Sequence, residues 1–598
     1  MHTGTEFTAQ ALKRKVPEIF TIAGQAATQE GFMEGLSRYI HRQAYETCDT
    51  YGQHSEQQIV RVRDCASVLT RMLNRRAEDR AGFSLTQALW DLACGKERPD
   101  LTPAFYAEII YLFLGVAGRE TVRSGLTDSS IPASLEGRAA AVERSKQLDL
   151  LAEAAKSSMS KYETGLADAA IQRRALRREK ILSYFKASPH DWDNWQWHIA
   201  HIIRDRSVLE QILPLSQDEK KSIDHAKSQR LPFGITPYYL SLMDEEPDTG
   251  RDRAIRSQVI PPLSYTKLMD RALHSEDTCL DFMRESDTSP VDLVTRRYPG
   301  ICILKPLNTC PQICVYCQRN WEIEDAMAPG SIASKDKLEA ALAWIAEHPS
   351  IHEVLVTGGD PLAIPDVPLK RILDGVAAIP SIERIRIGSR TLLTVPMRFS
   401  DDLVNMLASY RVPGKRQVAL VTHVQHAYEL TPETLNAVEK LRRKGISVFN
   451  QHVYTFFSSR RFEAAFLRRQ LALVGIDPYY TFNTKGKEET LEYRVPIARL
   501  LQEQKEEARL LPGISRTDEG VYNVPGMGKN YLRALQHRDL IAILPDGARL
   551  YEFHSWEKYI SSEISTHLSA DVPILDYLER LQTIGEDISN YESIWYYF

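Results

Sequence analysis

Three of the eight cysteines in this 598-residue chain lie close together, in the segment CPQICVYC. Cys310, Cys314 and Cys317 follow one another at spacings of four and three residues. Three thiolates on one short loop can bind three irons of a four-iron cluster and leave the fourth iron open to a substrate. A zinc ion or a chance grouping are the alternatives, but zinc needs a fourth ligand, and His348 is the first Cys or His after the segment.

The rest of the composition indicates a reduced, aqueous environment. The other five cysteines are scattered, unlike a disulfide framework. The chain is 43% hydrophobic and 26% charged with a net charge of −5, so we expect neither nucleic acid nor a membrane as partner. The start, MHTGTEFTAQALKRK, lacks a signal peptide, and the longest apolar run, around Glu108, is too short to span a bilayer. We therefore expect a cytoplasmic protein.

The sequence after residue 290 predicts the strands and helices that would position the cysteine segment. Short apolar runs alternate there with amphipathic helical stretches, and these runs are GICILKP, EVLVTGG, ERIRIGS, QVALVTHV, ISVFNQHVYTF and DPYYTFN. The alternation predicts βαβ units with a parallel sheet, and six such units would form most of a barrel. Functional groups in such sheets gather at the C-terminal ends of the strands, where the cysteine segment lies.

The two ends of the chain lack this alternation of strands and helices. Residues up to about 185 are predicted to be helical and to serve packing, assembly or regulation. Near the other end, LIAILPDGARLYEF predicts a hairpin that turns at Asp546 and Gly547. The tail after about residue 565 is expected to be helical.

Two further motifs adjoin predicted strands. Gly358 and Gly359 end the second strand and precede Asp360, and adjacent glycines let a ligand approach the backbone closely, although such a pair alone is usually just a turn. Lys529 follows the turn PGMG. A lysine that forms a Schiff base needs an accessible ammonium beside a yielding backbone, whereas an isolated lysine at such a turn is normally a solvated surface residue.

Together these residues resemble the radical S-adenosylmethionine (SAM) superfamily and, within it, the lysine 2,3-aminomutase family. The resemblance begins near DWDNWQWHIAHIIRD, passes through LPFGITPYYLSLMD and RRYPG, and extends to about residue 555. It implies an α/β fold, a partial (β/α)6 barrel with a large all-helical N-terminal extension. The implied regions are the extension (1–185), a helical lead-in (186–290), the barrel (291–500) and a C-terminal region with the cofactor lysine, hairpin and helical tail (501–598).

The resemblance also assigns cofactors to residues. The three cysteines would bind a [4Fe-4S] cluster. The residues that would contact SAM are Gly358, Gly359, Asp360, His423 and Gln451. Lys529 matches the lysine that holds pyridoxal phosphate, and Arg297, with Tyr298 beside it, matches a phosphate-binding arginine. Arg319 matches the arginine that binds the α-carboxylate of the substrate.

Departures from the family bear on the substrate. Lysine aminomutases hold the distal ammonium of lysine with two aspartates, and the matching positions here are Lys485 and Asn523. A substrate ammonium about 4 Å from a lysine would be repelled, whereas a distal carboxylate would gain a charge-assisted hydrogen bond. Glutamate 2,3-aminomutases carry this Lys and Asn pair, so glutamate is the expected substrate. Alternatively, Lys485 is a surface lysine in its KGKEE run.

The expected enzyme is therefore an isomerase, a radical SAM and pyridoxal phosphate-dependent 2,3-aminomutase that converts L-glutamate into β-glutamate. It would need a reductant such as flavodoxin or ferredoxin, and we expect a homo-oligomer. Three alternatives remain open. They are the same chemistry on another amino acid, a radical SAM reaction without pyridoxal phosphate, and a non-enzymatic iron–sulfur scaffold or redox sensor.

Overall fold

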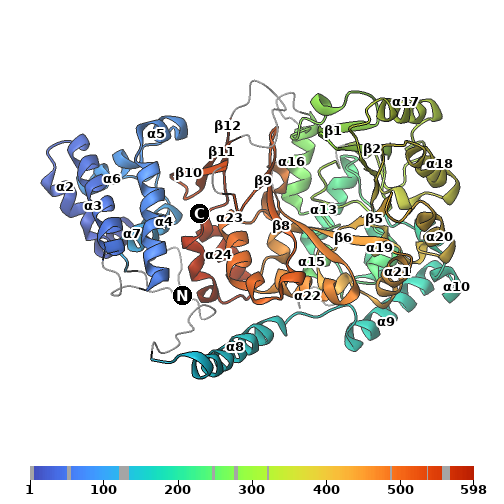
Figure 1. The fold of residues 1–598 in the computed structure, drawn as a ribbon, viewed down its shortest axis with the longest axis horizontal. Helices are drawn as coiled ribbons and strands as arrows, with labels where there is room; N and C mark the ends of the chain where they lie inside the picture. The colour runs from blue at the N-terminus through green and yellow to red at the C-terminus, as the bar shows by residue number, and fades with distance from the viewer. Residues whose placement is uncertain are drawn as a thin grey trace.

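Helices surround two β-sheets in this protein (Figure 1). The computed structural model describes residues 6–49, 55–119, 134–245, 250–274, 280–319, 322–484, 488–534, 537–554 and 566–598. The larger sheet has nine strands and the smaller one has three. No helix in these ranges is long and apolar enough to cross a membrane.

The N-terminal region is helical, as predicted. Its helices are α1 (Ala9–Lys15), α2 (Pro17–Gln25), α3 (Gln29–Asp49), α4 (Glu56–Met72), α5 (Arg75–Ala81), α6 (Leu85–Ala93), α7 (Pro103–Val116), α8 (Gly137–Met159) and α9 (Asp168–Phe185). The apolar run around Glu108 forms α7, which begins where the Thr102 hydroxyl accepts a hydrogen bond from Phe105 N. Nearly all of α7 is buried, so this run is a core helix.

Short helices connect this region to the larger sheet. They are α10 (Pro189–Trp192), α11 (Trp195–Ala200), α12 (Arg206–Ile212), α13 (Gln217–Ser228), α14 (Pro237–Leu240), α15 (Arg253–Arg256), α16 (Leu263–His274) and the 3₁₀ turn η3 (Ser286–Thr288).

The nine-stranded sheet follows the chain order from β1 to β9. Its strands are β1 (Val294–Tyr298), β2 (Ile301–Leu307), β3 (Glu353–Gly358), β4 (Arg384–Gly388), β5 (Gln417–Thr422), β6 (Ser447–Tyr454), β7 (Asp477–Asn483), β8 (Glu519–Val524) and β9 (Gly528–Tyr531). Strands β2 to β8 run parallel, and β1 and β9 pair antiparallel at the two edges. The six predicted strands are β2 to β7, whereas β1, β8 and β9 were not predicted. The short, polar runs VTRRY and GKNY lack the apolar signature that identifies a buried strand.

Helices connect the parallel strands. They are α17 (Lys335–Ala346), α18 (Asp366–Ala377), α19 (Thr391–Thr394), α20 (Asp401–Ser409), α21 (Pro432–Arg443), α22 (Glu463–Val474) and α23 (Ile497–Gln502). Single turns lie among them, namely η5 (Pro361–Ala363), η6 (Pro396–Arg398), η7 (Ala427–Glu429), η8 (Phe456–Ser458), η9 (Glu488–Tyr493), the π-helical η10 (Glu503–Glu507), η11 (Ala508–Leu510) and η12 (Gly513–Ser515).

The two faces of the sheet have different roles because successive side chains of a strand point to opposite faces. In β3, Val354 and Val356 are fully buried in the core formed with the connecting helices. The residues that alternate with them, Glu353, Leu355 and Thr357, line a cavity on the other face. The sheet therefore packs against helices on one side and faces the cavity on the other.

The C-terminal region holds the smaller sheet. Its elements are β10 (Arg538–Ile543), β11 (Arg549–His554), β12 (Thr566–Ala570), α24 (Ile574–Thr583) and the 3₁₀ segment η14 (Ile588–Tyr596). The predicted hairpin is present, since β10 pairs antiparallel with β11 and Gly547 adopts φ +84° in the turn. The prediction of a wholly helical tail is wrong, because residues 566–570 pair with β11 before α24 begins.

Several N-terminal helices, α7 among them, share a hydrophobic core with the C-terminal elements. One hydrophobic core contains Phe105 and Phe113 of α7, Tyr551 of β11 and Tyr577 of α24. Figure 1 shows the N-terminal helices, in blue, beside the C-terminal strands and α24, in red. The two ends of the chain therefore fold together against one side of the larger sheet.

Candidate active site

One cavity of about 1640 Å³ lies on the inner face of the nine-stranded sheet. A typical small-molecule pocket measures about 300–1,000 Å³, so this cavity has room for more than one ligand. It is lined by every predicted site residue that the structure describes, namely Arg297, Tyr298, Cys310, Cys314, Cys317, Arg319, Gly358, Gly359, Asp360, His423, Gln451, Asn523 and Lys529. Lys485 lies outside the described residues. Residues that are far apart in the sequence thus face the same space.

The three clustered cysteines lie on the loop that leaves β2, and all three are half-buried. The guanidinium of Arg390 donates a hydrogen bond to Cys314 Sγ at 2.8 Å, and Arg319 N donates to Cys317 Sγ at 3.4 Å. Donors aimed at sulfur fit thiolates that bind iron. Cys302 differs from these three, because burial inside β2 raises the pKa of its thiol to about 12.

Among the described residues, no three His, Cys, Asp or Glu side chains are placed to share one metal ion. A four-iron cluster does not need three ligands that converge on one ion, because each thiolate binds its own iron. Both side-chain amide atoms of Gln312, inside the cysteine segment, and Nε of Arg390 are buried without a hydrogen-bond partner in the described structure. Such orphaned polar atoms fit a site that takes a further group.

The glycine pair serves a packing role that the sequence did not reveal. Gly358 has φ +104°, and a Cβ on Gly359 would lie 2.0 Å from the carbonyl oxygen of Thr309. The glycines thus let the end of β3 approach the base of the cysteine loop. Both oxygens of Asp360 accept hydrogen bonds from the segment after β4, with Ser389 Oγ at 2.6 Å and Arg390 N at 2.8 Å. Contacts of these three residues with SAM stay a prediction.

His423 follows the end of β5, Gln451 lies within the neighbouring strand β6, and both face the cavity. Burial, followed by the nearby Arg390, lowers the pKa of His423 to about 4. The imidazole is therefore neutral at neutral pH and can accept or donate a hydrogen bond without adding charge to the cavity.

Lys529 lies inside the cavity and is not a solvated surface lysine. Strands β8 and β9 form a hairpin that places Asn523 directly opposite Lys529 on the same face. Lys529 Nζ donates a hydrogen bond to the Tyr298 hydroxyl at 2.9 Å, and it lies 5.1 Å from the centre of the Tyr480 ring. The lysine thus lies between the rings of Tyr298 and Tyr480.

Three cationic side chains of this region surround one buried carboxylate. Glu285 accepts a hydrogen bond from Lys305 Nζ at 2.5 Å, pairs with Arg319 and lies 3.9 Å from Arg297 Nη2. Burial favours the neutral acid, but Arg319 and Lys305 outweigh it and lower the pKa of Glu285 to about 2. Three cations around one carboxylate leave excess positive charge, which suits an anionic ligand. Glu322 offsets part of this charge by pairing with Arg319.

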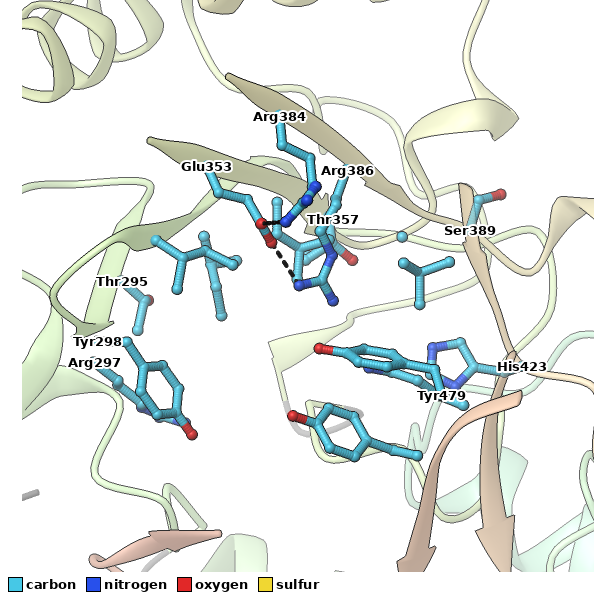
Figure 2. Close-up of a pocket in the computed structure, with 18 of the residues that line it drawn as sticks. Thr295, Arg297, Tyr298, Glu353, Thr357, Arg384, Arg386, Ser389, His423 and Tyr479 are labelled. Carbon is cyan, nitrogen blue, oxygen red and sulfur yellow. Dashed lines mark hydrogen bonds and ion pairs between the residues drawn. The ribbon is translucent and has the colours of Figure 1, made fainter. Parts of the chain in front are cut away.

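The cavity continues along the strands to their N-terminal ends. Glu353 of β3 bonds Arg384 at 2.7 Å and Arg386 at 2.6 Å, as the dashed lines in Figure 2 show. In the same view Tyr479 and His423 project towards the space that Tyr298 and Arg297 face from β1. Arg386 also lies 5.2 Å from the centre of the Tyr479 ring.

Sequence reasoning missed several of these residues. Lys305 and Arg386 could have been found from strand alternation, since each is a charged residue at a position of an apolar strand that alternates with the buried ones. Arg390 follows directly after a predicted strand, where functional groups gather. Glu285 carries no such signal, because only the tertiary fold brings η3 against β1 and β2.

Comparison with known proteins identifies the family. A sequence model of the Radical SAM superfamily matches residues 304–459, which contain the cysteine loop, the glycine pair and His423. An uncharacterised KamA family protein of Methanocaldococcus jannaschii is 42% identical over 551 residues, covering 89% of this chain and 88% of its own length. The chain belongs to the KamA family of radical SAM proteins.

Named aminomutases are also related to this KamA family chain. The glutamate 2,3-aminomutase of Clostridioides difficile is 33% identical over 323 residues, covering 54% of this chain and 72% of its own length. The L-lysine 2,3-aminomutase of Bacillus subtilis is 30% identical over 425 residues, covering 68% of this chain and 84% of its own length. The family implies a [4Fe-4S] cluster and SAM, and the homologues indicate an isomerase. The two identities are too similar to decide between glutamate and lysine.

The match to the KamA family protein of Methanocaldococcus jannaschii also includes N-terminal helices. It covers 89% of the chain, whereas residues 186–598 make up less than three quarters of it. At least part of the helical extension therefore has a counterpart in that relative.

Proposed function

We propose that this chain is a radical SAM 2,3-aminomutase that uses pyridoxal phosphate and converts L-glutamate into β-glutamate. The observation that carries the proposal is that the cysteine loop and Lys529 face one cavity. In this isomerisation the C2–N bond breaks, a C3–N bond forms, and one hydrogen moves from C3 to C2. No oxidant or reductant is consumed overall, although an external reductant such as flavodoxin or ferredoxin must activate the cluster.

The described residues provide a place for each cofactor. When bound, the cluster and SAM would supply the radical that removes hydrogen, and pyridoxal phosphate would supply the carbonyl that holds the migrating nitrogen. Cys310, Cys314 and Cys317 would bind the cluster. Lys529 would hold pyridoxal phosphate, with the Tyr298 hydroxyl 2.9 Å from its Nζ to orient the ammonium. Arg297, half-buried beside them on β1, would bind the phosphate.

Arg319 would bind the α-carboxylate of the substrate. Its guanidinium is already ordered by Glu285 and Glu322, so little conformational entropy is lost when a carboxylate joins it. Its Nε is buried without a partner among the described residues, which leaves a donor for that carboxylate.

A curved sheet supports the proposed partial (β/α)6 barrel over residues 291–500. Strands β1 and β9 are eight spacings apart in the strand order, which would be about 38 Å in a flat sheet. Nevertheless Lys529 of β9 bonds Tyr298 of β1. Two side chains cannot bridge such a distance, so curvature that brings the edges together accounts for this contact.

The choice of glutamate rests on the sign of the charge in the cavity. Asn523, which replaces an aspartate of the lysine enzymes, faces the cavity opposite Lys529. A neutral amide can donate to a distal carboxylate, whereas an aspartate would attract an ammonium. The cations around Glu285 also favour an acidic substrate. We propose Lys485 as the second contact to the distal carboxylate.

The test is anaerobic turnover by the reconstituted full chain, with ¹³C-labelled glutamate and separately with labelled lysine, followed by NMR. We expect β-glutamate from glutamate and no product from lysine. Lys529→Ala should abolish turnover, and borohydride reduction should attach the cofactor to Lys529 in the wild type, as peptide mass spectrometry would show. Lys370→Ala is the matched control, because Lys370 is an exposed lysine on α18 that pairs with Asp374. This variant should turn over glutamate as the wild type does.

Other outcomes would reject the proposal in part or in whole. Formation of β-lysine from lysine by the wild type would overturn the substrate assignment. The double variant Asn523→Asp with Lys485→Asp, in contrast, is expected to gain activity towards lysine. SAM cleavage without a borohydride-trapped cofactor would point to a different radical SAM reaction. A loaded cluster that never cleaves SAM would indicate a scaffold or redox sensor.

A further inference from the structure

Arg390 is a buried charge in direct contact with the cysteine loop. It follows β4 and has 8% of its surface exposed. Its Nη1 lies 2.8 Å from Cys314 Sγ. The only ion pair of this side chain in the described structure is with Glu429, at 2.7 Å, and that carboxylate is fully buried. Burying such a pair is costly unless further hydrogen bonds satisfy both partners, so its presence beside a thiol calls for an explanation.

The surrounding residues hold this guanidinium in place. Asp360 accepts a hydrogen bond from Arg390 N at 2.8 Å and so fixes the start of the segment. Nη2 donates to the Tyr239 hydroxyl at 3.1 Å and to Gln258. Because these partners come from separate parts of the chain, the position of the guanidinium against Cys314 is determined by the whole fold.

We propose that Arg390 is a positioning residue that raises the reduction potential of the cluster through its charged hydrogen bond to Cys314. The proposal rests on the proposed function, because it assumes that Cys310, Cys314 and Cys317 bind a [4Fe-4S] cluster. Hydrogen bonds to cluster sulfurs and nearby charge both set cluster potentials. Reduction adds one negative charge to the cluster, and a guanidinium in a poorly screened interior stabilises that charge.

Glu429 reduces the effect of Arg390 on the cluster potential. The proposal therefore also predicts a shift of opposite direction when Glu429 is changed. Its negative charge pairs with Nη2, whereas Cys314 contacts Nη1, and it offsets part of the positive field. Removing the Arg390 charge should make the cluster harder to reduce. Neutralising Glu429 while keeping its shape should make the cluster easier to reduce.

The experiment measures the midpoint potential of the reconstituted full chain by anaerobic titration, followed by cluster absorbance and EPR. For Arg390→Gln we expect at least a tenfold lower ratio of reduced to oxidised cluster at a fixed potential, which equals about 59 mV for one electron. Arg390→Lys keeps the charge and should recover part of the shift, and Glu429→Gln should shift the ratio the other way. Arg398→Gln is the matched control, because Arg398 is also a buried arginine on the same connection but bonds Leu362 O, Ile364 O and Asp366.

Each outcome decides one question. Iron and sulfide content is measured first, and a wild type that holds no cluster would reject the proposed function. With the cluster loaded, an unchanged potential in Arg390→Gln, or an equal shift in Arg398→Gln, would overturn the role of Arg390. If Arg390→Gln fails to load the cluster, Glu429→Gln decides, since a potential equal to that of the wild type would then overturn it.

Discussion

The resemblance to the family assigned Asp360 to SAM binding. The structure places it at the cavity, but its carboxylate oxygens accept hydrogen bonds from Ser389, Leu362, and the backbone of Arg390 and Thr391. The chain itself thus accounts for a buried acid here, because a buried carboxylate must be hydrogen-bonded. Side-chain identity and position predict that a residue lines a site, whereas its partners decide what it does there.

Burial also sets the charge of a histidine outside the cavity. His198 is fully buried, with Nε2 2.7 Å from the carbonyl oxygen of Trp192 and Nδ1 without a partner in the described structure. Burial, aided by nearby His201 and Arg178, lowers its pKa to about 4. The unfolded chain, with a histidine pKa near 6.5, therefore binds more protons, and stability falls as pH drops from about 6.5 towards 4.

We expect His198→Gln to reduce this acid sensitivity. Within that pH window the histidine contributes up to about 1.4 kcal/mol of lost stability for each pH unit. Thermal denaturation at a series of pH values from 7.5 to 5 should show a shallower loss of stability in the variant. His274→Gln, an exposed histidine on α16, serves as control and should follow the wild type. Parallel pH curves for all three proteins would contradict this account.

At the scale of elements, the end of β3 and the cysteine loop form one packed unit. A Cβ on Gly359 would overlap the backbone of Thr309, just before Cys310, and backbone cannot move as a flexible side chain can. The glycine is thus needed so that the loop can lie against the strand.

We expect Gly359→Ala to displace the cysteine loop. The variant should load less than half the iron of the wild type after reconstitution, with nearly unchanged circular dichroism, because the clash is confined to one loop. Gly513→Ala is a suitable control, since an added Cβ there meets nothing within 4 Å. Full iron loading by Gly359→Ala would show that the loop can move without loss of the site.

For the whole molecule, a buried ion pair joins the two ends of the chain. Glu108 of α7 bonds Arg549 of β11 at 2.9 and 3.0 Å, with both side chains 2% exposed. Arg549 also donates to the carbonyl oxygens of Trp595 and Tyr597. This contact lies in the core that the N-terminal helices share with the C-terminal elements, so the helical extension is part of the structural unit.

We expect Glu108→Gln to destabilise this shared core by about 3–5 kcal/mol, because it leaves the buried guanidinium without a countercharge. Chemical denaturation, with hydrogen exchange in α7 and β11, would measure the loss. Arg71→Gln is the matched control, because its exposed pair with Asp539 also joins an N-terminal helix to the smaller sheet. That change should cost no more than about 1 kcal/mol. Equal losses in both variants would refute the special role of the buried pair.

The sequence by itself determined the local features of this protein. Cysteine spacing identified the loop at Cys310, Cys314 and Cys317, and apolar runs of strand length predicted β2 to β7. These features depend on neighbours in the chain and on side-chain periodicity, which are visible without a fold. Resemblance to a family then assigned roles to Arg297 and to Lys529, which its local sequence alone would have left as a surface residue.

Only the tertiary structure decided which side chains share an environment. The contact of Glu285 with Arg319, the guanidinium of Arg390 at Cys314 and the pair of Glu108 with Arg549 join residues far apart in the chain. Strands β8 and β9 were likewise unrecognised until their pairing with β7 and with each other was known. Local sequence carries no record of such neighbours, because burial and electrostatic pairing arise when distant segments pack together.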